Sequence, residues 1–174
     1  MDYAVDVQGF LRPGNDFILK ELAIIEITAD YLLKEKVFLF EEPFPWKRLT
    51  VKYRNINSQL TEKKHGLSWN SGTVPYTLVA EVFKEHLSGA KNVYVKGPTK
   101  KQWLEERFGL KGVVHDICFI DYSDQPTKSA TICLNHSVGK RGVACALQNA
   151  RIIKTKVLEN LAWEDMDWEE SLYA

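Results

Sequence analysis

The sequence predicts an α/β fold with a mixed sheet, made of an antiparallel three-strand meander plus parallel strands and flanked by helices. Two observations support this prediction. Three segments rich in β-branched and aromatic residues, 2–8, 17–28 and 31–40, follow one another closely. After them, helical and strand-like patterns alternate toward the end of the chain, as they do in proteins that pack helices on a partly parallel sheet.

Turn residues delimit the meander. Pro13 before Gly14 separates the first two strands, and Pro43 and Pro45 end the third. We expect the segment 44–73 to be irregular, because it shows no regular apolar period. The elements predicted beyond it are helix 75–86, strand 92–97, a helix that Pro98 opens and Gly109 ends, strand 113–122 and helix 140–161.

Length and charge suggest one domain with a distinct end. The chain has 174 residues, 45% of them hydrophobic, and 23 basic residues balance 23 acidic ones. Residues 164–174 hold five acids and no base, so we predict a mildly basic domain, 1–163, and an acidic, aromatic C-terminal tail, 164–174, that could bind a protein partner. No apolar run could span a bilayer and the first residues lack a signal-peptide pattern. We therefore expect an intracellular protein of the cytoplasm or nucleus, without membrane contact.

Cys133, His136 and Cys145 have the residue types and the spacing of a metal site. Two thiolates and an imidazole this close in sequence can converge on one tetrahedral ion if a fourth ligand comes from elsewhere. The chain has three cysteines, an odd number that argues against a disulfide framework. The third, Cys118, lies in the strand-like HDICFID and is expected to pack as a small hydrophobic residue. The alternative to a metal site at Cys133, His136 and Cys145 is two buried thiols and a hydrogen-bonded histidine.

Glu21 is a carboxylate in the middle of an otherwise apolar strand face. By strand alternation it shares one face with the apolar residues Phe17, Leu19, Ala23, Ile25 and Ile27. A carboxylate there needs a partner. Glu26, by contrast, shares its face with Lys20, which could form a salt bridge with it, so it has no such need. The alternative for Glu21 is an edge position that reaches solvent.

Basic and aromatic residues are interleaved in segment 44–73, a composition that can hold phosphates and stack on bases. The alternative is a solvated loop whose aromatic rings cap the core. Lys140 and Arg141 stand out, because a metal bound by His136 and Cys145 would hold the loop between them rigid. The candidate RNA contacts are Lys47, Arg48, Lys63, Lys64, Lys100, Lys101, Lys140, Arg141 and Arg151, with Trp46 and Trp69 as stacking groups.

The order of elements resembles the ribonuclease-H-like fold of the four-acid (DEDD) exonucleases. The likeness rests on Asp6 in VDVQGF, on ELAII, on the turn KHGLSW, on VYVKGPTKKQWL and on the final histidine-bearing segment. Two-metal hydrolysis needs several carboxylates. In this chain Gln8 stands where an acid is expected, VYVKGPTKKQWL has no acid, and the terminal aspartate after His136 is missing. No catalytic residue is therefore assigned.

The set that replaces those acids is similar to the Maelstrom domain, a branch of this fold with a Glu-Cys-His-Cys zinc site. Glu21, Cys133, His136 and Cys145 match that set in order and in the final spacings. Glu26 is the competing choice for the glutamate, and the strand-face argument favours Glu21. The resemblance implies one structural Zn²⁺, binding of single-stranded RNA, and a role in small-RNA (piRNA) silencing of transposons. It also implies an exonuclease-like fold whose active site is inactive.

Two other functions remain open from the sequence. One is a metal-independent nuclease that cuts single-stranded RNA with basic residues and Asp6 or His65. The other is a protein-interaction module that acts through the acidic tail and has no role with nucleic acid. His65 and His115 are reserve metal ligands, each expected to be hydrogen-bonded locally instead.

Overall fold

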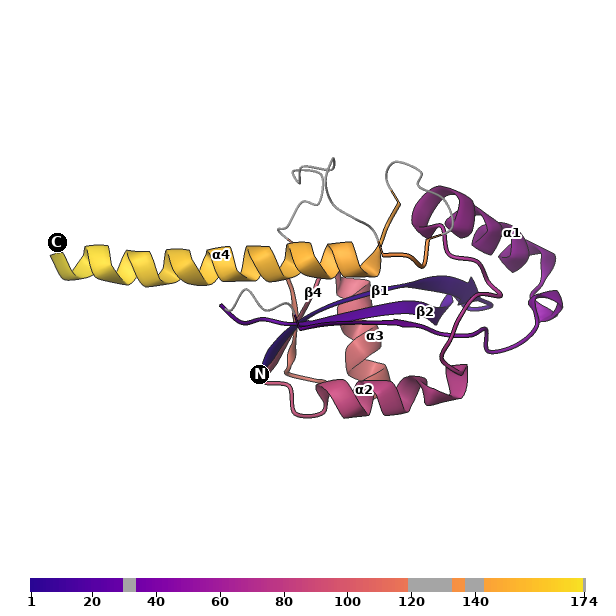
Figure 1. The fold of residues 1–174 in the computed structure, drawn as a ribbon, viewed down its shortest axis with the longest axis horizontal. Coiled ribbons are helices and arrows are strands. Elements are labelled where there is room, and N and C mark those ends of the chain that lie inside the picture. The colour runs from indigo at the N-terminus through magenta and orange to yellow at the C-terminus, as the bar shows by residue number, and fades with distance from the viewer. Residues whose placement is uncertain (30–33, 119–132, 137–142, 174) are drawn as a thin grey trace.

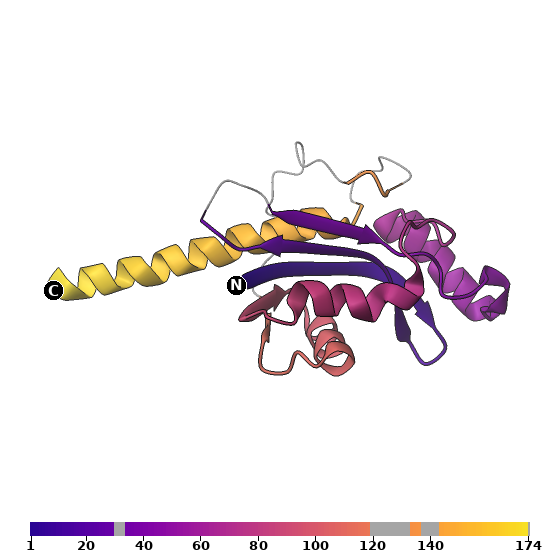
Figure 2. The ribbon, with the colours of Figure 1, turned by 60° about the horizontal axis from the view of Figure 1, so that its bottom comes forward.

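The chain forms an α/β structure with a five-stranded mixed sheet in the order β3-β2-β1-β4-β5, flanked by helices (Figures 1 and 2). The computed structural model describes residues 1–29, 34–118, 133–136 and 143–173, with side chains described up to residue 161. The predicted fold class, a mixed sheet with helices packed on it, is confirmed at this level.

The sheet combines antiparallel and parallel pairing as predicted. Strands β1 (Asp2–Arg12), β2 (Asp16–Glu26) and β3 (Glu35–Leu39) form the antiparallel meander. Strands β4 (Asn92–Val95) and β5 (Val114–Asp116) are added in parallel on the other side of β1. The first two strands pair over nearly their full length, so β1 is longer than the predicted 2–8. The last predicted strand, 113–122, is described only to residue 118.

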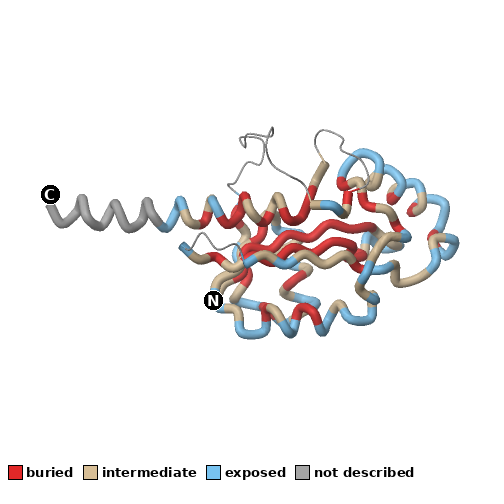
Figure 3. Tube along the Cα trace, in the orientation of Figure 1, coloured by how far each residue is buried: buried red, intermediate tan, exposed pale blue. Residues whose placement is uncertain are grey.

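Helices cover both faces of this sheet. Helices α2 (Val79–Leu87) and α3 (Pro98–Phe108) pack on the face that carries Val5 and Leu22. Helix α4 (Ala146–Tyr173) packs on the opposite face, where a second apolar cluster joins it to the sheet. The central strands are buried on both sides, as the red tube in Figure 3 shows. Burial on both faces explains why β1 and β2 read as nearly continuous apolar runs.

A β-bulge interrupts the pairing of β1 with β2. Gln8 pairs with Glu21 and Gly9 pairs with Leu19, so Lys20 has no partner residue in β1. Side chains on either side of a bulge change faces. Leu19 therefore joins the apolar cluster under α2 and α3, whereas Ala23 and Ile25 face α4. The prediction that the alternate residues from Phe17 to Ile27 share a single face was wrong, because strict alternation cannot anticipate an extra residue.

The segment 44–73, which was expected to be irregular, contains three successive helical elements. A short 3-10 turn, η1 (Trp46–Arg48), is followed by α1 (Val51–Leu60) and directly by a π-helical turn, η2 (Thr61–His65). The buried residues of α1 are Tyr53 and the polar Asn57. This helix therefore lacks the apolar stripe by which a buried helix is predicted from sequence. Its one local signal is the N-cap, where the Thr50 side chain accepts a bond from Tyr53 N.

The last helix differs from its prediction at both ends. It begins at Ala146 rather than 140, and it continues through 164–173, the segment separated as an acidic tail. Both views show its C-terminal end projecting beyond the sheet (Figures 1 and 2). Among the described helices, none combines the length and apolar character that crossing a bilayer requires.

Candidate metal centre

Four side chains from three distant parts of the chain meet on the α4 face of the sheet. Glu21 comes from β2, Cys133 and His136 from the turn 133–136, and Cys145 from the residue before α4. One ligand atom from each lies within 4.8 Å of all the others. Three of the four residues are buried and Cys133 is partly buried. These are the four residues that the sequence selected as metal ligands, and together they could hold one metal ion.

The separations between these atoms are close to those of a tetrahedral site, the two from Glu21 being slightly shorter than ideal. Metal bonds of about 2.0 Å to oxygen or nitrogen and 2.3 Å to sulfur would place the ligand atoms roughly 3.3–3.8 Å apart. The two sulfurs of Cys133 and Cys145 are 3.6 Å apart. Glu21 Oε2 is 3.1 Å from Cys133 Sγ and 3.2 Å from His136 Nε2. His136 Nε2 is buried and has no partner with hydrogen-bond geometry, as expected of a nitrogen that points at an ion.

Neighbouring groups hold the ligands in place. His136 Nδ1 donates to the carbonyl of His65, which leaves Nε2 directed at the other three ligands. Asn135 Nδ2 donates to Glu21 Oε2 at 3.0 Å, and the backbone N–H of Ala146 donates to Glu21 Oε1 at 2.8 Å. Sequence reasoning missed Asn135, Ala146 and the His65 carbonyl. Only Asn135 had a signal, its place beside a ligand, because backbone groups leave no trace in residue identity.

Three backbone features position the cluster. The bulge in β2 turns Glu21 toward α4, and Cys145 stands at the N-terminus of α4, where its carbonyl accepts a bond from Asn149 N at 3.0 Å. The positive end of a helix stabilises a nearby thiolate or carboxylate. The π-helical turn η2 supplies a third support, because Lys64 O accepts a bond from Ala144 N and His65 O accepts one from His136.

The four side chains shift one another's pKa values. Burial raises the pKa of Glu21, but the adjacent His136 ring, the Cys133 thiol and the Ala146 N–H outweigh it and lower that pKa. The contact between the two sulfurs lowers the pKa of Cys145 to about 5 and raises the pKa of Cys133. Burial lowers the pKa of His136, but the adjacent Cys145 and Glu21 raise it to about 10. A cation bound by all four would take the place of the protons on Cys133 and His136.

Asp6, the acid on which the exonuclease resemblance partly rested, has no exposed surface and is surrounded by donors. Lys100 Nζ lies 2.5 Å from Oδ1, while Gln8 Nε2 and Asn149 Nδ2 lie 3.0 Å and 2.9 Å from Oδ2. Both carboxylate oxygens are thus occupied by protein groups. In the described part of the chain, only the Glu21 cluster brings three or more potential ligand side chains together.

The other candidate ligands have local partners, as expected. His65 is fully buried, donates from Nε2 to Gly9 O at 2.9 Å and accepts at Nδ1 from Leu67 N at 3.0 Å. The exposed ring of His115 bonds to Asn92 Oδ1 at 2.8 Å. Glu26 pairs with Lys34 at 3.3 Å. The predicted pairing of Glu26 with Lys20 was wrong, because Lys20 instead donates to the carbonyls of Trp69 and Ser71.

The surroundings of one cysteine and one tryptophan also differ from the prediction. Cys118, which was expected to be buried, lies two residues after β5 and is exposed. Trp69, proposed to stack on a base, is only 8% exposed and packs edge-on against Phe10. Trp46 is half-buried against Trp69, with ring centroids 5.3 Å apart. These rings close a third apolar cluster between α1 and the sheet, which is the core-capping role weighed as the alternative.

The candidate RNA contacts fall into distinct groups. Lys47 and Arg48 lie exposed before α1, and Lys63 and Lys64 lie exposed on η2 at its other end. The remaining three in the described region are engaged in ion pairs: Lys100 with Asp6, Lys101 with Glu105, and Arg151 with Glu35 through two bonds of 2.7 Å. Lys140 and Arg141 lie outside the described residues.

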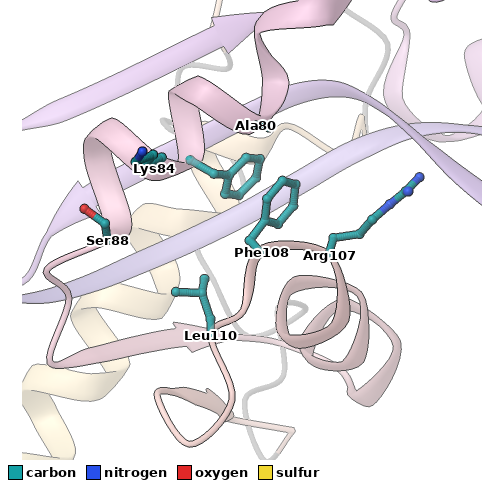
Figure 4. Close-up of a pocket in the computed structure, with 7 residues that line it drawn as sticks. Ala80, Lys84, Ser88, Arg107, Phe108 and Leu110 are labelled. Carbon is teal, nitrogen blue, oxygen red and sulfur yellow. The ribbon is translucent and has the colours of Figure 1, made fainter.

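A pocket of about 280 Å³ lies between α2 and α3, on the opposite side of the sheet (Figure 4). The rings of Phe83 and Phe108 stack in it at 3.8 Å with their planes 11° apart. Lys84 and Arg107 add two basic side chains to its lining. It shares no residue with the metal cluster, so it is not a route to that centre.

Comparison of this chain with protein-family models, with curated protein sequences and with solved structures gives no match.

Proposed function

We propose that this chain is a Maelstrom-like domain of the ribonuclease-H-like fold that holds one structural zinc ion, binds single-stranded RNA and lacks metal-dependent nuclease activity. Its cellular role would then be in small-RNA (piRNA) silencing of transposons. The observation that carries the proposal is the convergence of Glu21, Cys133, His136 and Cys145. The meander followed by two parallel strands supports the proposed fold.

The donor set favours zinc and a structural role. Thiolate sulfur prefers zinc to magnesium or calcium, which take oxygen ligands. Four protein ligands fill a tetrahedral shell and leave no open position for water or substrate. The ion would join β2, the turn 133–136 and the start of α4, so its binding would contribute directly to folding.

The surroundings of Asp6 argue against hydrolysis by two metal ions. That chemistry needs carboxylates on two ions about 4 Å apart. Here the Asp6 carboxylate is held by an ammonium and two amides, and Gln8 and Asn149 both donate to it. The same burial weakens the metal-independent nuclease, because neither Asp6 nor His65 is exposed to a substrate.

The support for RNA binding comes from the basic residues of η2. Lys63 and Lys64 are exposed, and the backbone of the same turn is bonded to Ala144 and His136. The metal centre thus fixes the segment that presents these two ammonium groups. Phosphate binding by positioned lysines is independent of sequence and sensitive to salt.

The metal is tested by elemental analysis of purified protein, with Glu21→Gln compared with Glu26→Gln. We expect about one zinc per chain in the wild type and in Glu26→Gln, because Glu26 faces Lys34 outside the cluster. Glu21→Gln removes a charged ligand and should lose most of the metal and several degrees of thermal stability. Zinc-free wild-type protein of full stability would refute the proposed centre.

RNA binding is tested by the anisotropy of a labelled single-stranded RNA over a series of salt concentrations. The double variant Lys63→Ala/Lys64→Ala should bind less tightly, and its salt dependence should be shallower by about one to two ion equivalents. Lys84→Ala, an exposed lysine on the opposite face, is the matched control. Equal binding by all three proteins would exclude η2 as the contact. Cleavage of the RNA in the presence of EDTA would favour the nuclease instead.

A further inference from the structure

Cys133 and Cys145 form a pair that can be oxidised together. We propose that this pair is a reversible oxidation site, at which a peroxide converts the two metal-bound thiolates into a disulfide and releases the ion. The inference rests on the proposed metal centre and adds a chemical modification to it. It starts from the two sulfurs, which lie 3.6 Å apart.

The two cysteines differ in access. Cys133 is partly exposed. The next residue in the same turn, Leu134, is fully exposed, which shows that the turn lies at the surface. Cys145 has no exposed surface and stands at the N-terminus of α4. A small oxidant therefore reaches the Cys133 sulfur first, and Cys145 is placed to resolve the product.

The reaction balances with hydrogen peroxide as the oxidant. The Cys133 thiolate attacks one peroxide oxygen, the O–O bond breaks, and hydroxide leaves, so Cys133 becomes a sulfenic acid. The Cys145 thiolate then attacks the Cys133 sulfur, the S–S bond forms and a second hydroxide leaves. Each sulfur loses one electron, and the two electrons reduce one peroxide to two hydroxides, which take up protons from the buffer.

Loss of the ion follows from the ligand chemistry. A disulfide sulfur is not a thiolate ligand, so only Glu21 and His136 would remain, too few for a stable zinc site. Glu21 and His136 can bind each other once the ion has left. His136 Nε2 lies 3.2 Å from Glu21 Oε2, and Ala146 N–H still holds the other carboxylate oxygen. The oxidised centre can therefore close on an ion pair, and a dithiol can restore the thiolates.

The test uses the full chain with Cys118→Ser, which removes the exposed third thiol and leaves the cluster intact. The reduced, metal-loaded protein is treated with hydrogen peroxide while a chromophoric chelator records free zinc. We expect free thiols to fall from two to none, about one zinc to be released per chain, and a peptide map to show Cys133 joined to Cys145. Dithiothreitol with added zinc should restore the two free thiols and the bound zinc.

Other outcomes overturn the inference separately from the metal proposal. Zinc that stays bound at peroxide concentrations that oxidise Cys118 in the wild-type chain would refute the oxidation site and leave the metal centre standing. Zinc release with sulfinic acid at either cysteine, and no disulfide, would refute the paired chemistry. Protein without any zinc before treatment would refute the proposed centre, and the coupled release with it, even if the disulfide formed.

Discussion

His65 is a buried histidine that supports the metal centre without being one of its ligands. Its ring bonds to Gly9 O and Leu67 N, and its carbonyl accepts from His136. Burial lowers the pKa of His65 to about 4, against the partial opposition of the Gly9 bond. A cation in the neighbouring cluster would lower this pKa further by repulsion. His65 is thus neutral in the folded protein at every pH above about 5.

The depressed pKa of His65 predicts a loss of stability in acid. The unfolded chain binds the proton near its ordinary pKa of about 6.5, and the folded chain only near 4. The stabilisation is complete above pH 6.5 and falls by about 3 kcal/mol as pH drops to 4. His65→Gln keeps an amide donor for Gly9 but cannot titrate, so its free energy of unfolding should fall less over this range. Urea unfolding from pH 7 to 4 measures the difference, with exposed His115→Gln as the control. Parallel curves for wild type and His65→Gln would contradict it.

The bulge between β1 and β2 is the element on which the site depends. It lets Leu19 face α2 and α3 while Glu21, two residues later, faces the other helix. Gly9 is opposite the bulge, where the strands approach closely. A Cβ at this position would lie 2.0 Å from Ile18 O and 2.8 Å from a ring carbon of Phe17. Only glycine fits there without moving β2.

Gly9→Ala is predicted to destabilise the protein by about 3 kcal/mol or more, because the backbone of β2 must shift to relieve the clash. The same shift would move Glu21, so the zinc content should fall as well. Gly14→Ala is the matched control, since it has a left-handed φ of 84° but open space around it, and should cost about 1 kcal/mol. Denaturant unfolding and metal analysis of both variants test this. Equal costs would show that the bulge tolerates a side chain.

The η2 turn is the second element that the site needs. In a π-helix the carbonyls of the last turn are displaced from their usual partners, and here Lys64 O and His65 O bond to the segment that carries the ligands. The turn ends at Gly66, whose left-handed φ of 65° stops the helix. The turn that carries the exposed lysines is therefore hydrogen-bonded directly to the segment that carries the candidate ligands.

Across the whole molecule, one buried carboxylate ties three elements together. Asp6 on β1 has no exposed surface and bonds to Lys100 on α3 and Asn149 on α4. Helices α3 and α4 cover opposite faces of the sheet, so this network joins the two layers. These contacts give Asp6 a structural role in the described part of the chain.

Lys100→Met should destabilise the domain by about 3 kcal/mol, because it leaves the buried Asp6 carboxylate without its counter-charge. Lys101→Met is the control on the next residue of the same helix. Lys101 pairs with Glu105 on the surface, so its loss should cost at most about 1 kcal/mol. Chemical unfolding without RNA separates the two. A larger cost for Lys101→Met would show that the Asp6 pair contributes little.

The sequence predicted the sheet well and the helical segment 46–65 poorly. Long apolar strands are visible because their period is local, and Pro98 and Gly109 marked both ends of α3. Helix α1 was missed because it buries few apolar side chains and is fixed by contacts such as Asn57 with the backbone of Leu11. Trp69 was misjudged for the same reason, since its burial depends on Phe10, far away in the chain.

The sequence alone determined the chemistry of the site: which donors this chain has, and that two thiols and an imidazole occur within one short segment. It also selected Glu21 over Glu26, although its premise of one shared face was wrong. Only the tertiary structure decided that Glu21 reaches those donors, through a bulge, a helix N-terminus and two backbone carbonyls. The physical reason is that donor type is a property of a side chain, whereas convergence depends on backbone geometry and long-range packing.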